Sequence, residues 1–236
     1  MDRIEKFIGK RIFFLNGVPD PVGSWAGFFA GHYKEIQQPQ WECADRQHLH
    51  GVPQVDIIIA GLPRYLWYGD TRNPILNIVG ATMFMRSWQN KPLLKQGGAV
   101  ILISKCDGHI DTEKHPSYAH ALEHFREAGS AAAFEERHFE NLYADKRMLE
   151  QYHACNAYHP VHPVWLFNEN QYALDHAGKI IIATAENPEA PAQVGADYAA
   201  TFDDAMKQAL EVTGSDPRIL VLPNFFSYAP MLFLVE

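Results

Sequence analysis

Four short runs of aliphatic residues constrain the fold of this 236-residue chain more than any other feature of its sequence. Each run is apolar throughout instead of alternating apolar and polar residues, which is typical of strands covered on both faces. The segments between them indicate helices: residues 116–128 begin with a proline, and residues 202–212 follow Thr201, a favourable N-cap. This alternation predicts a three-layer α/β fold, in which a mainly parallel sheet carries helices on both faces. The runs are residues 55–60, 99–104, 179–184 and 218–222.

The first part of the chain follows a different pattern. Residues 11–16 and 24–30 are largely apolar and flank a segment with two glycines and two prolines, which predicts an antiparallel hairpin. Residues 33–54 are polar and show no strand pattern. We therefore expect an N-terminal hairpin extension over residues 1–54 and an α/β domain over residues 55–236.

Composition and charge exclude several classes of protein. The net charge of −8 argues against a nucleic-acid partner, which would need a basic face. No apolar run approaches the ~20 residues that span a membrane, and the charged N-terminus is unlike a signal peptide. The three cysteines are widely spaced and include no CxxC pair, so we expect reduced thiols, a cytoplasmic location and no metal site.

The chain also lacks the short motifs of common enzyme classes. It contains no GxGxxG, GxxxxGK[ST], GxSxG or HExxH sequence, which removes the main support for nucleotide-binding, hydrolase and metalloprotease functions. Gly97-Gly98 precedes a strand instead of following one, so we interpret it as a tight turn into that strand and not as a phosphate loop.

The segment after the first apolar run is a candidate ligand site, because ligands of open parallel sheets bind beyond the carboxyl ends of the strands. The alternative is a solvated loop in which Asn73 and Asn77 cap the next helix. Lys105 and Asp107, after the second run, would lie at the same edge, and Cys106 is expected to be a buried apolar side chain and no nucleophile. The expected substrate-binding residues of this loop are Tyr68, Asp70, Arg72, Asn73 and Asn77.

Residues 156–165 form a second candidate site, rich in aromatic side chains. His159 and His162 each precede a proline, which favours an extended backbone and would direct both imidazoles to one side. Such a pair can transfer protons or bind a ligand, and Trp165 would supply an apolar wall. The alternative is a loop whose histidines bond to backbone carbonyls. We expect both rings at the carboxyl edge of the sheet, facing a crevice bordered by Asp70, Asn73 and Asn77.

Taken in order, several segments resemble the C-terminal half of the nickel-pincer lactate racemases and their uncharacterised homologues. Residues 14–16 and 29–31 are similar to the strand pair that leads out of that family's N-terminal half. Residues 55–63 resemble its next strand and the loop after it, residues 94–108 are the most specific stretch, and residues 205–223 resemble its end. The resemblance implies a Rossmann-like α/β unit that faces an N-terminal domain, with substrate and cofactor between them.

The chain departs from this family in two respects. The family's N-terminal half carries the lysine that anchors the nickel-pincer nucleotide, the nickel-binding histidine and two proton-shuttling histidines, and no segment here corresponds to it. The cofactor is thus implied by the resemblance alone. In true lactate racemases an Asn-x-Tyr-Gln-x-x-Lys run contacts the substrate; here Asn77 matches, but Val79, Gly80 and Met83 replace the other three residues. This departure argues against lactate itself as the substrate.

The resemblance therefore implies the substrate-side domain of a 2-hydroxy acid racemase or epimerase. Such a domain would be inactive until a cofactor-bearing half joins it, and His159 and His162, near a histidine of the family's pattern, would be catalytic. The alternative is a stand-alone domain that binds a small polar or anionic molecule without catalysis. A third possibility is a purely structural relative, in which the crevice is filled.

Overall fold

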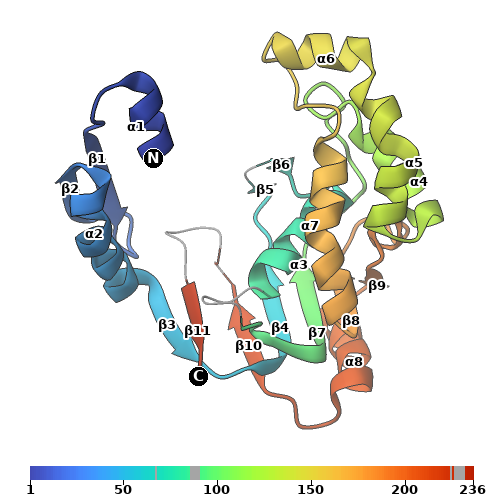
Figure 1. The fold of residues 1–236 in the computed structure, drawn as a ribbon. Helices are drawn as coiled ribbons and strands as arrows, with labels where there is room; N and C mark the ends of the chain where they lie inside the picture. Colours follow the sequence, from blue (N-terminus) through green and yellow to red (C-terminus); the bar gives the residue numbers. More distant parts are fainter. Residues whose placement is uncertain (67, 86–90, 224, 226–231) are drawn as a thin grey trace.

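The computed structural model describes residues 1–66, 68–85, 91–223, 225 and 232–236, and a parallel β-sheet lies at its centre (Figure 1). The five strands of this sheet within the described residues are β4 (Val55–Gly61), β7 (Leu94–Ile103), β8 (Lys179–Ala183), β9 (Asp197–Ala199) and β10 (Ile219–Leu222). Their order is β10-β4-β7-β8-β9, and every neighbouring pair is parallel. Each of the four apolar runs forms one of these strands, so that prediction is confirmed.

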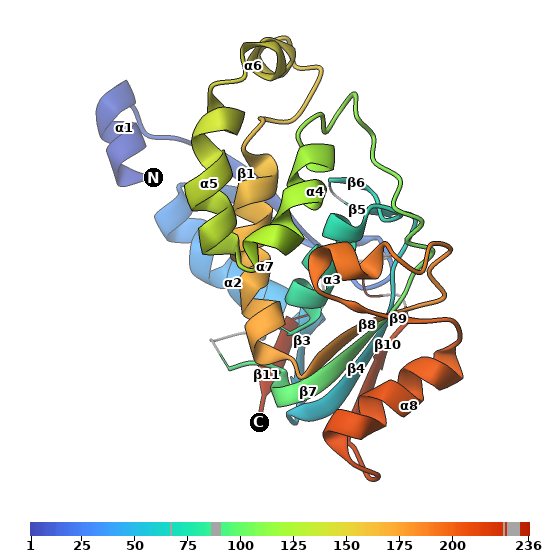
Figure 2. The same ribbon diagram turned by 90° about the vertical axis from the view of Figure 1, so that its right-hand side faces the viewer.

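Helices cover both faces of the sheet (Figure 2). Ile57, Ile101 and Ile181 point to one face and pack against α8 (Phe202–Thr213). Alternate residues of the same strands, such as Ile58 and Leu102, point to the other face. There they join a larger core with α3 (Pro74–Met85), α4 (Tyr118–Ala128), α5 (Ala131–Tyr143) and α7 (His162–His176), and η1 (Pro191–Val194) packs against α3 and α4. The expected three-layer α/β fold is confirmed.

The helix positions agree with the prediction in part. The expected helices at residues 116–128 and 202–212 correspond to α4 and α8, and Thr201 caps α8 by accepting a hydrogen bond from the Asp204 amide. The sequence analysis did not identify α5 or α6 (Lys146–His153), although Ser130 and Asp145 cap their first turns by accepting hydrogen bonds from backbone amides. No helix formed by the described residues is long and apolar enough to cross a membrane.

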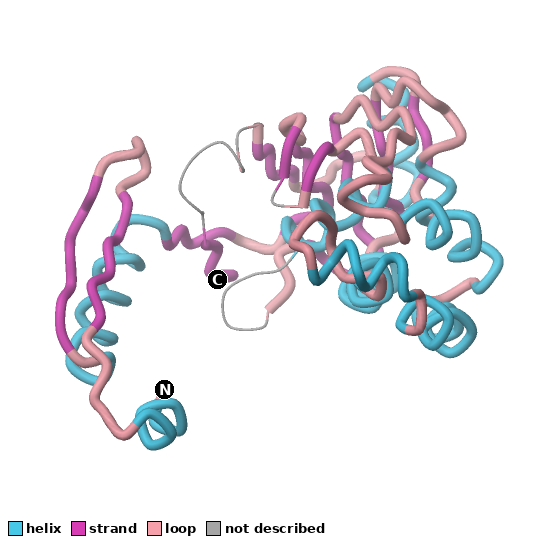
Figure 3. Tube along the Cα trace, turned by 90° about the horizontal axis from the view of Figure 1, so that it is seen from above, coloured by secondary structure: helices cyan, strands magenta, loops and turns pink. Residues whose placement is uncertain are grey.

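The N-terminal extension stands apart from the main sheet (Figures 1 and 3). It holds α1 (Asp2–Ile8), the antiparallel pair β1 (Phe14–Pro19) and β2 (Trp25–Gly31), and α2 (Tyr33–His48). The predicted hairpin is therefore confirmed. Helix α2 packs on one face of the hairpin. The large apolar side chains of the other face, namely Phe13, Leu15, Trp25 and Phe28, are exposed.

The prediction of no strand in residues 33–54 is wrong. Residues Leu49–Val52 form β3, which pairs in parallel with β11 (Leu232–Val235). The sequence Leu-His-Gly-Val has no strand-like alternation, and its partner is more than 180 residues away, so no local signal marks the pairing. The described C-terminal strand therefore lies beside the extension and not on the five-stranded sheet (Figure 1).

Gly97-Gly98 lies inside β7, so the interpretation as a turn before the strand is wrong. Gly97 has a φ of 78°, a backbone conformation that favours glycine, and the pairing of β7 with β4 shifts between Val55 and Ile57. A Cβ atom on Gly98 would lie 2.6 Å from the carbonyl oxygen of Asp56. The two glycines thus permit a bulge and a close approach of two backbones.

Candidate functional site

The loop after β4 forms one side of a hollow at the carboxyl edge of the sheet. It contains a short antiparallel pair, β5 (Tyr65–Leu66) and β6 (Gly69–Asp70). The hollow has a volume of about 400 Å³. We call it the cationic hollow, and it is lined by Leu62, Arg64, Thr71, Arg72, Lys105 and Glu186. Lys105 follows β7, as expected, so the polar loops after β4 and β7 meet at this hollow.

The Asp70–Arg72 pair fixes the base of this hollow. The Asp70 carboxylate accepts hydrogen bonds from Arg72 Nε at 2.9 Å and from the Arg72 backbone amide at 3.0 Å. Burial by itself would raise the pKa of Asp70, but these hydrogen bonds and the guanidinium charge hold it below its usual value. Asp107 lies 3.5 Å from the same guanidinium, and Arg64 lies 3.6 Å from Asp70. Arg72 is therefore held in place by two carboxylates.

Asn73 and Asn77 are buried beneath the loop. The Asn73 side chain accepts a hydrogen bond from the amide of Ile75, which is the capping role weighed for it. Asn77 donates to the carbonyl oxygens of Thr71 at 2.6 Å and Asn73 at 3.1 Å. Its Oδ1 atom is buried and has no hydrogen-bond partner among the described residues. Both amides position the loop, and their contact with a ligand stays a prediction.

His162 begins α7, so the expectation of an extended backbone at this histidine is wrong. A proline is tolerated in the first turn of a helix, and Pro163 occupies that place. The Nδ1 atom of His162 lies 2.8 Å from the hydroxyl of Tyr118. Burial, and to a lesser degree His115 and His159, lowers the pKa of His162 to about 4. The imidazole is therefore neutral at neutral pH.

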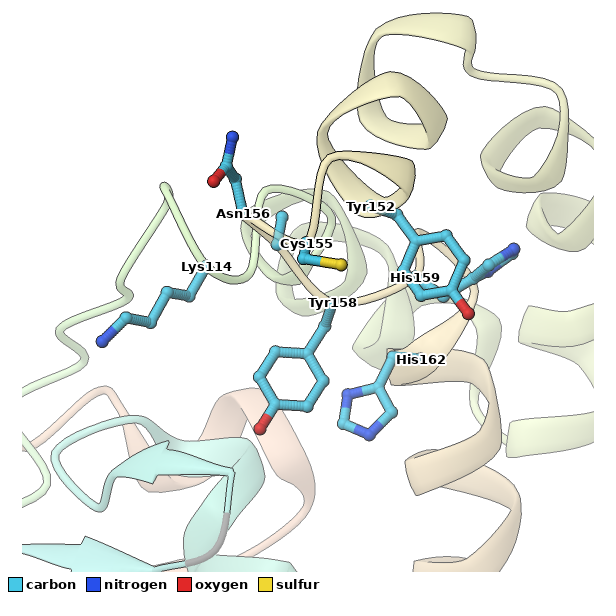
Figure 4. Close-up of a pocket in the computed structure, with 8 residues that line it drawn as sticks. Lys114, Tyr152, Cys155, Asn156, Tyr158, His159 and His162 are labelled. Carbon is cyan, nitrogen blue, oxygen red and sulfur yellow. The ribbon is translucent and has the colours of Figure 1, made fainter.

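His159 lies in the turn before α7 and contacts other rings. Its centroid is 4.8 Å from that of Tyr152, and its Nδ1 atom accepts a hydrogen bond from the Val161 amide. Burial, followed by the charge of His153, lowers the pKa of His159. The two histidines line one hollow of about 460 Å³ but contact different neighbours within it. We call this the aromatic hollow, and it is lined by Lys114, Tyr152, Cys155, Asn156, Ala157, Tyr158, His159 and His162 (Figure 4).

Tyr68 links the aromatic hollow to the loop after β4. Its ring makes edge contacts with His162 at 5.0 Å, with Tyr158 at 6.2 Å and with Trp165 at 6.2 Å. Tyr68 thus brings the loop after β4 into contact with His162 and Trp165. Asp70, Asn73 and Asn77 do not line the aromatic hollow, so the expected crevice that these residues would share with both histidines is not present among the described residues. Trp165 is half-exposed, and its ring stacks 5.7 Å from that of His162.

Sequence reasoning did not identify His115 and Tyr118. The buried His115 ring stacks on Tyr158 at 4.5 Å, and its Nε2 atom bonds to the carbonyl oxygen of Tyr68. Burial raises the pKa of Tyr118 far above its usual range, so its hydroxyl stays protonated. The sequence held one signal for His115. Like His159 and His162, it is followed directly by a proline, and a helix begins shortly after that proline.

The described residues do not fit a nickel-pincer cofactor. Among the described residues, no group of three or more histidine, cysteine, aspartate or glutamate side chains is arranged to hold a metal ion. Cys106 is fully buried, and burial raises its pKa to about 12, which agrees with the expectation of an inert thiol. Lys105, whose amine is paired with Glu186 at 2.8 Å, is exposed at the cationic hollow. No chemical step is therefore assigned to that cofactor on this chain.

Comparison with known proteins places the fold. No protein-family model and no curated protein matches the chain. The lactate racemase apoprotein from Thermoanaerobacterium thermosaccharolyticum superposes with a TM-score of 0.58 at 17% sequence identity, over 94% of this chain and 46% of that chain. This chain shares the fold of part of lactate racemase. A protein from Thermotoga maritima gives a TM-score of 0.49 at 12% identity, over 100% of this chain and 51% of that chain.

The resemblance inferred from the sequence is thus confirmed at the level of the fold. The chain spans about half the length of each of these two structures. Activity, substrate and partner stay proposals.

Proposed function

We propose that this chain is the substrate-side domain of a racemase or epimerase that acts on a 2-hydroxy acid. The observation that carries the proposal is the fold shared with part of lactate racemase over 94% of the chain. The ordered sequence resemblance from Asn16 to Pro223 also supports it. The partner would be a cofactor-bearing half, supplied by another segment or another subunit.

The cationic hollow is the proposed position of the substrate carboxylate. Arg64, Arg72 and Lys105 line it. Glu186 offsets the charge of Lys105, and Asp70 and Asp107 offset the charges of the two arginines. The side chains of Lys105 and Glu186 are 75% and 51% exposed, so their ion pair contributes little and an incoming carboxylate can replace it. Arg64 is better placed for this role than Arg72, because its side chain is 65% exposed and a guanidinium binds a carboxylate through two parallel hydrogen bonds.

His162 and His159 are the proposed proton-transfer residues, and the contacts favour His162. Because Tyr118 contacts Nδ1 of His162, Nε2 is the ring nitrogen that remains for a substrate. A neutral imidazole can accept a proton there. The proposed substrate-binding residues are Tyr68, Asp70, Arg72, Asn73, Asn77 and Trp165. Asn73 and Asn77 would act through the hydrogen bonds by which they position the loop.

The test is a racemisation assay followed by chiral chromatography. The isolated chain should racemise neither D- nor L-2-hydroxy acids, because the proposed cofactor-bearing half is missing. The same chain co-purified with the polypeptide encoded beside it should be active. Racemisation by the isolated chain would show that this division of labour is wrong, and failure to bind any 2-hydroxy acid would remove the proposal.

The second candidate is a stand-alone domain that binds a small anion without catalysis. The cationic hollow favours it, as does the lack of a fit to the nickel-pincer cofactor among the described residues. Binding of a 2-hydroxy acid with no activity in any purified complex would support this function. A purely structural relative is disfavoured, because both hollows are open and not filled by side chains.

A further inference from the structure

The aromatic hollow has walls made largely of rings. Tyr152 and His159 form one pair, with centroids 4.8 Å apart, and Tyr158 and His162 form a second pair, with centroids 4.9 Å apart. Figure 4 shows the Tyr152–His159 pair beside and above the Tyr158–His162 pair, with Cys155 above Tyr158. A flat apolar group placed here would meet the faces or edges of several rings, and each such contact adds to the affinity beyond the effect of its buried area.

Burial favours the uncharged form of the two histidine rings in these walls. Burial is the main reason that the pKa values of His159 and His162 lie below the ordinary value for histidine. The partner of His162 on the protein side is the hydroxyl of Tyr118, which, unlike a carboxylate, does not draw a proton onto the imidazole. Water forms few hydrogen bonds with such a surface, so its displacement by an apolar ligand group is favourable.

The volume of the hollow exceeds what lactate needs. Pockets of roughly 300–1,000 Å³ hold ligands of drug size, and the aromatic hollow has about 460 Å³. The side chain of lactate is one methyl group, which would leave most of this space to water. The replacement of the family's substrate-contacting tyrosine, glutamine and lysine by Val79, Gly80 and Met83 also argues for a different side chain.

Lys114 supplies a cation at the rim of the hollow. Its side chain is 68% exposed, and its amine lies 3.7 Å from the Asp111 carboxylate, an exposed pair of low strength. Its positive charge can therefore attract an anionic ligand as it approaches, before the carboxylate reaches the cationic hollow.

We propose that the aromatic hollow binds the side chain of an aryl-substituted 2-hydroxy acid, with 3-phenyllactate as the simplest example. The aryl group lies between the Tyr152–His159 and Tyr158–His162 pairs, and Lys114 attracts the acid. This inference rests on the proposed function and names its substrate class.

Calorimetric titration of the full chain with 3-phenyllactate and with lactate tests the inference directly. Phenyllactate should bind about tenfold more tightly or better, since an aryl group buries far more surface than a methyl group. Equal affinities for the two acids, or no binding of phenyllactate, would overturn the inference.

A matched pair of variants locates the binding. Tyr152 and Tyr172 are exposed to 42% and 40%, and Tyr172 lies towards the far end of α7. Tyr152→Ala should weaken phenyllactate binding about threefold to tenfold, which corresponds to one lost ring contact, and should leave lactate binding unchanged. Tyr172→Ala should change neither affinity. Equal effects of the two variants would place the aryl group elsewhere and contradict the inference.

A third ligand separates this inference from the proposed function. 3-Phenylpropionate has the aryl group and the carboxylate of phenyllactate but lacks the 2-hydroxyl group. Suppose that 3-phenylpropionate binds, that Tyr152→Ala weakens this binding, and that no purified complex racemises any hydroxy acid. The aryl site is then supported and the racemase proposal fails. If the complex racemises lactate in preference to phenyllactate, the racemase proposal stands and the aryl site fails.

Discussion

The five-stranded sheet and the N-terminal extension bury their apolar residues to very different degrees. In the sheet, Ile57, Ile101 and Leu102 are 0% exposed, because α8 covers one face and α3 and α7 cover the other. In the extension, Phe13 is 73% and Leu15 is 72% exposed on a hairpin face that no described element covers. The sheet region thus stabilises itself by its own packing, whereas the extension presents the kind of apolar surface that marks interaction sites.

The largest difference between the regions is expected for one substitution made in both. Leu102→Ala should lower the free energy of unfolding by about 3–4 kcal/mol, since it opens a cavity in the core. Leu15→Ala should lower it by less than about 0.5 kcal/mol, because its side chain is already in solvent. Urea unfolding followed by circular dichroism measures both. Equal losses would mean that the hairpin face is covered in solution.

Replacing one glycine in each region by alanine tests the same comparison between the sheet and the extension. Gly98→Ala should cost about 2 kcal/mol, because its Cβ would meet the backbone oxygen of Asp56 at 2.6 Å, which cannot move away. Gly17→Ala in the extension would meet the side chain of Trp25 most closely, and that ring is 59% exposed and can swing aside. Its cost should stay below about 1 kcal/mol. Thermal unfolding of both variants gives the comparison, and a reversed order would contradict it.

A smaller effect depends on pH. The pKa of His162 is lowered to about 4, so below about pH 6.5 the unfolded chain binds a proton that the folded chain excludes. Stability should therefore fall as the pH drops from about 6.5 to about 4, by about 1–2 kcal/mol after allowance for the remaining exposure of the ring.

A substitution tests this pH effect. His162→Asn should make the fall in stability between about pH 6.5 and about pH 4 smaller but not abolish it, because burial also lowers the pKa values of His115 and His159. A profile that His162→Asn does not alter would show that this ring titrates normally in the folded chain.

The smallest effects are expected when ion pairs are removed, and here the two regions should lose about the same free energy of unfolding. Lys179→Gln removes the pair with Glu211 that joins β8 to α8, and Arg11→Gln removes the pair with Glu35 in the extension. Exposed ion pairs contribute at most about 1 kcal/mol, and salt screens them. Both variants should therefore unfold within about 1 kcal/mol of the parent chain. A larger loss for Lys179→Gln alone would show that this ion pair also stabilises the sheet region.

The sequence predicted the sheet better than the sites, for physical reasons. Strands such as residues 55–60 are buried on both faces, and that burial requires continuous apolar residues that can be recognised locally. The β3–β11 pair joins distant segments, and nothing local in residues 49–52 marks it. The helix start at His162 was missed because each proline was interpreted as excluding a helix, although the first turn accepts one.

The candidate site was predicted in the same uneven way. Ligands of parallel sheets bind beyond the carboxyl ends of the strands, and this rule alone predicts that Asp70, Arg72 and Lys105 lie near one another, as they do. The positions of His115 and Tyr118 could not be predicted, because their contacts with His162 depend on how α4 and α7 pack, which sequence spacing does not record.

The β3–β11 pairing has a mechanical consequence for the extension. A single linking strand can swivel about its own axis. Two parallel strands joined by backbone hydrogen bonds, residues Leu49–Val52 and Leu232–Val235, behave as a flat strip that bends across its width but resists torsion. The pairing with β11 therefore opposes rotation of the extension about the axis of β3.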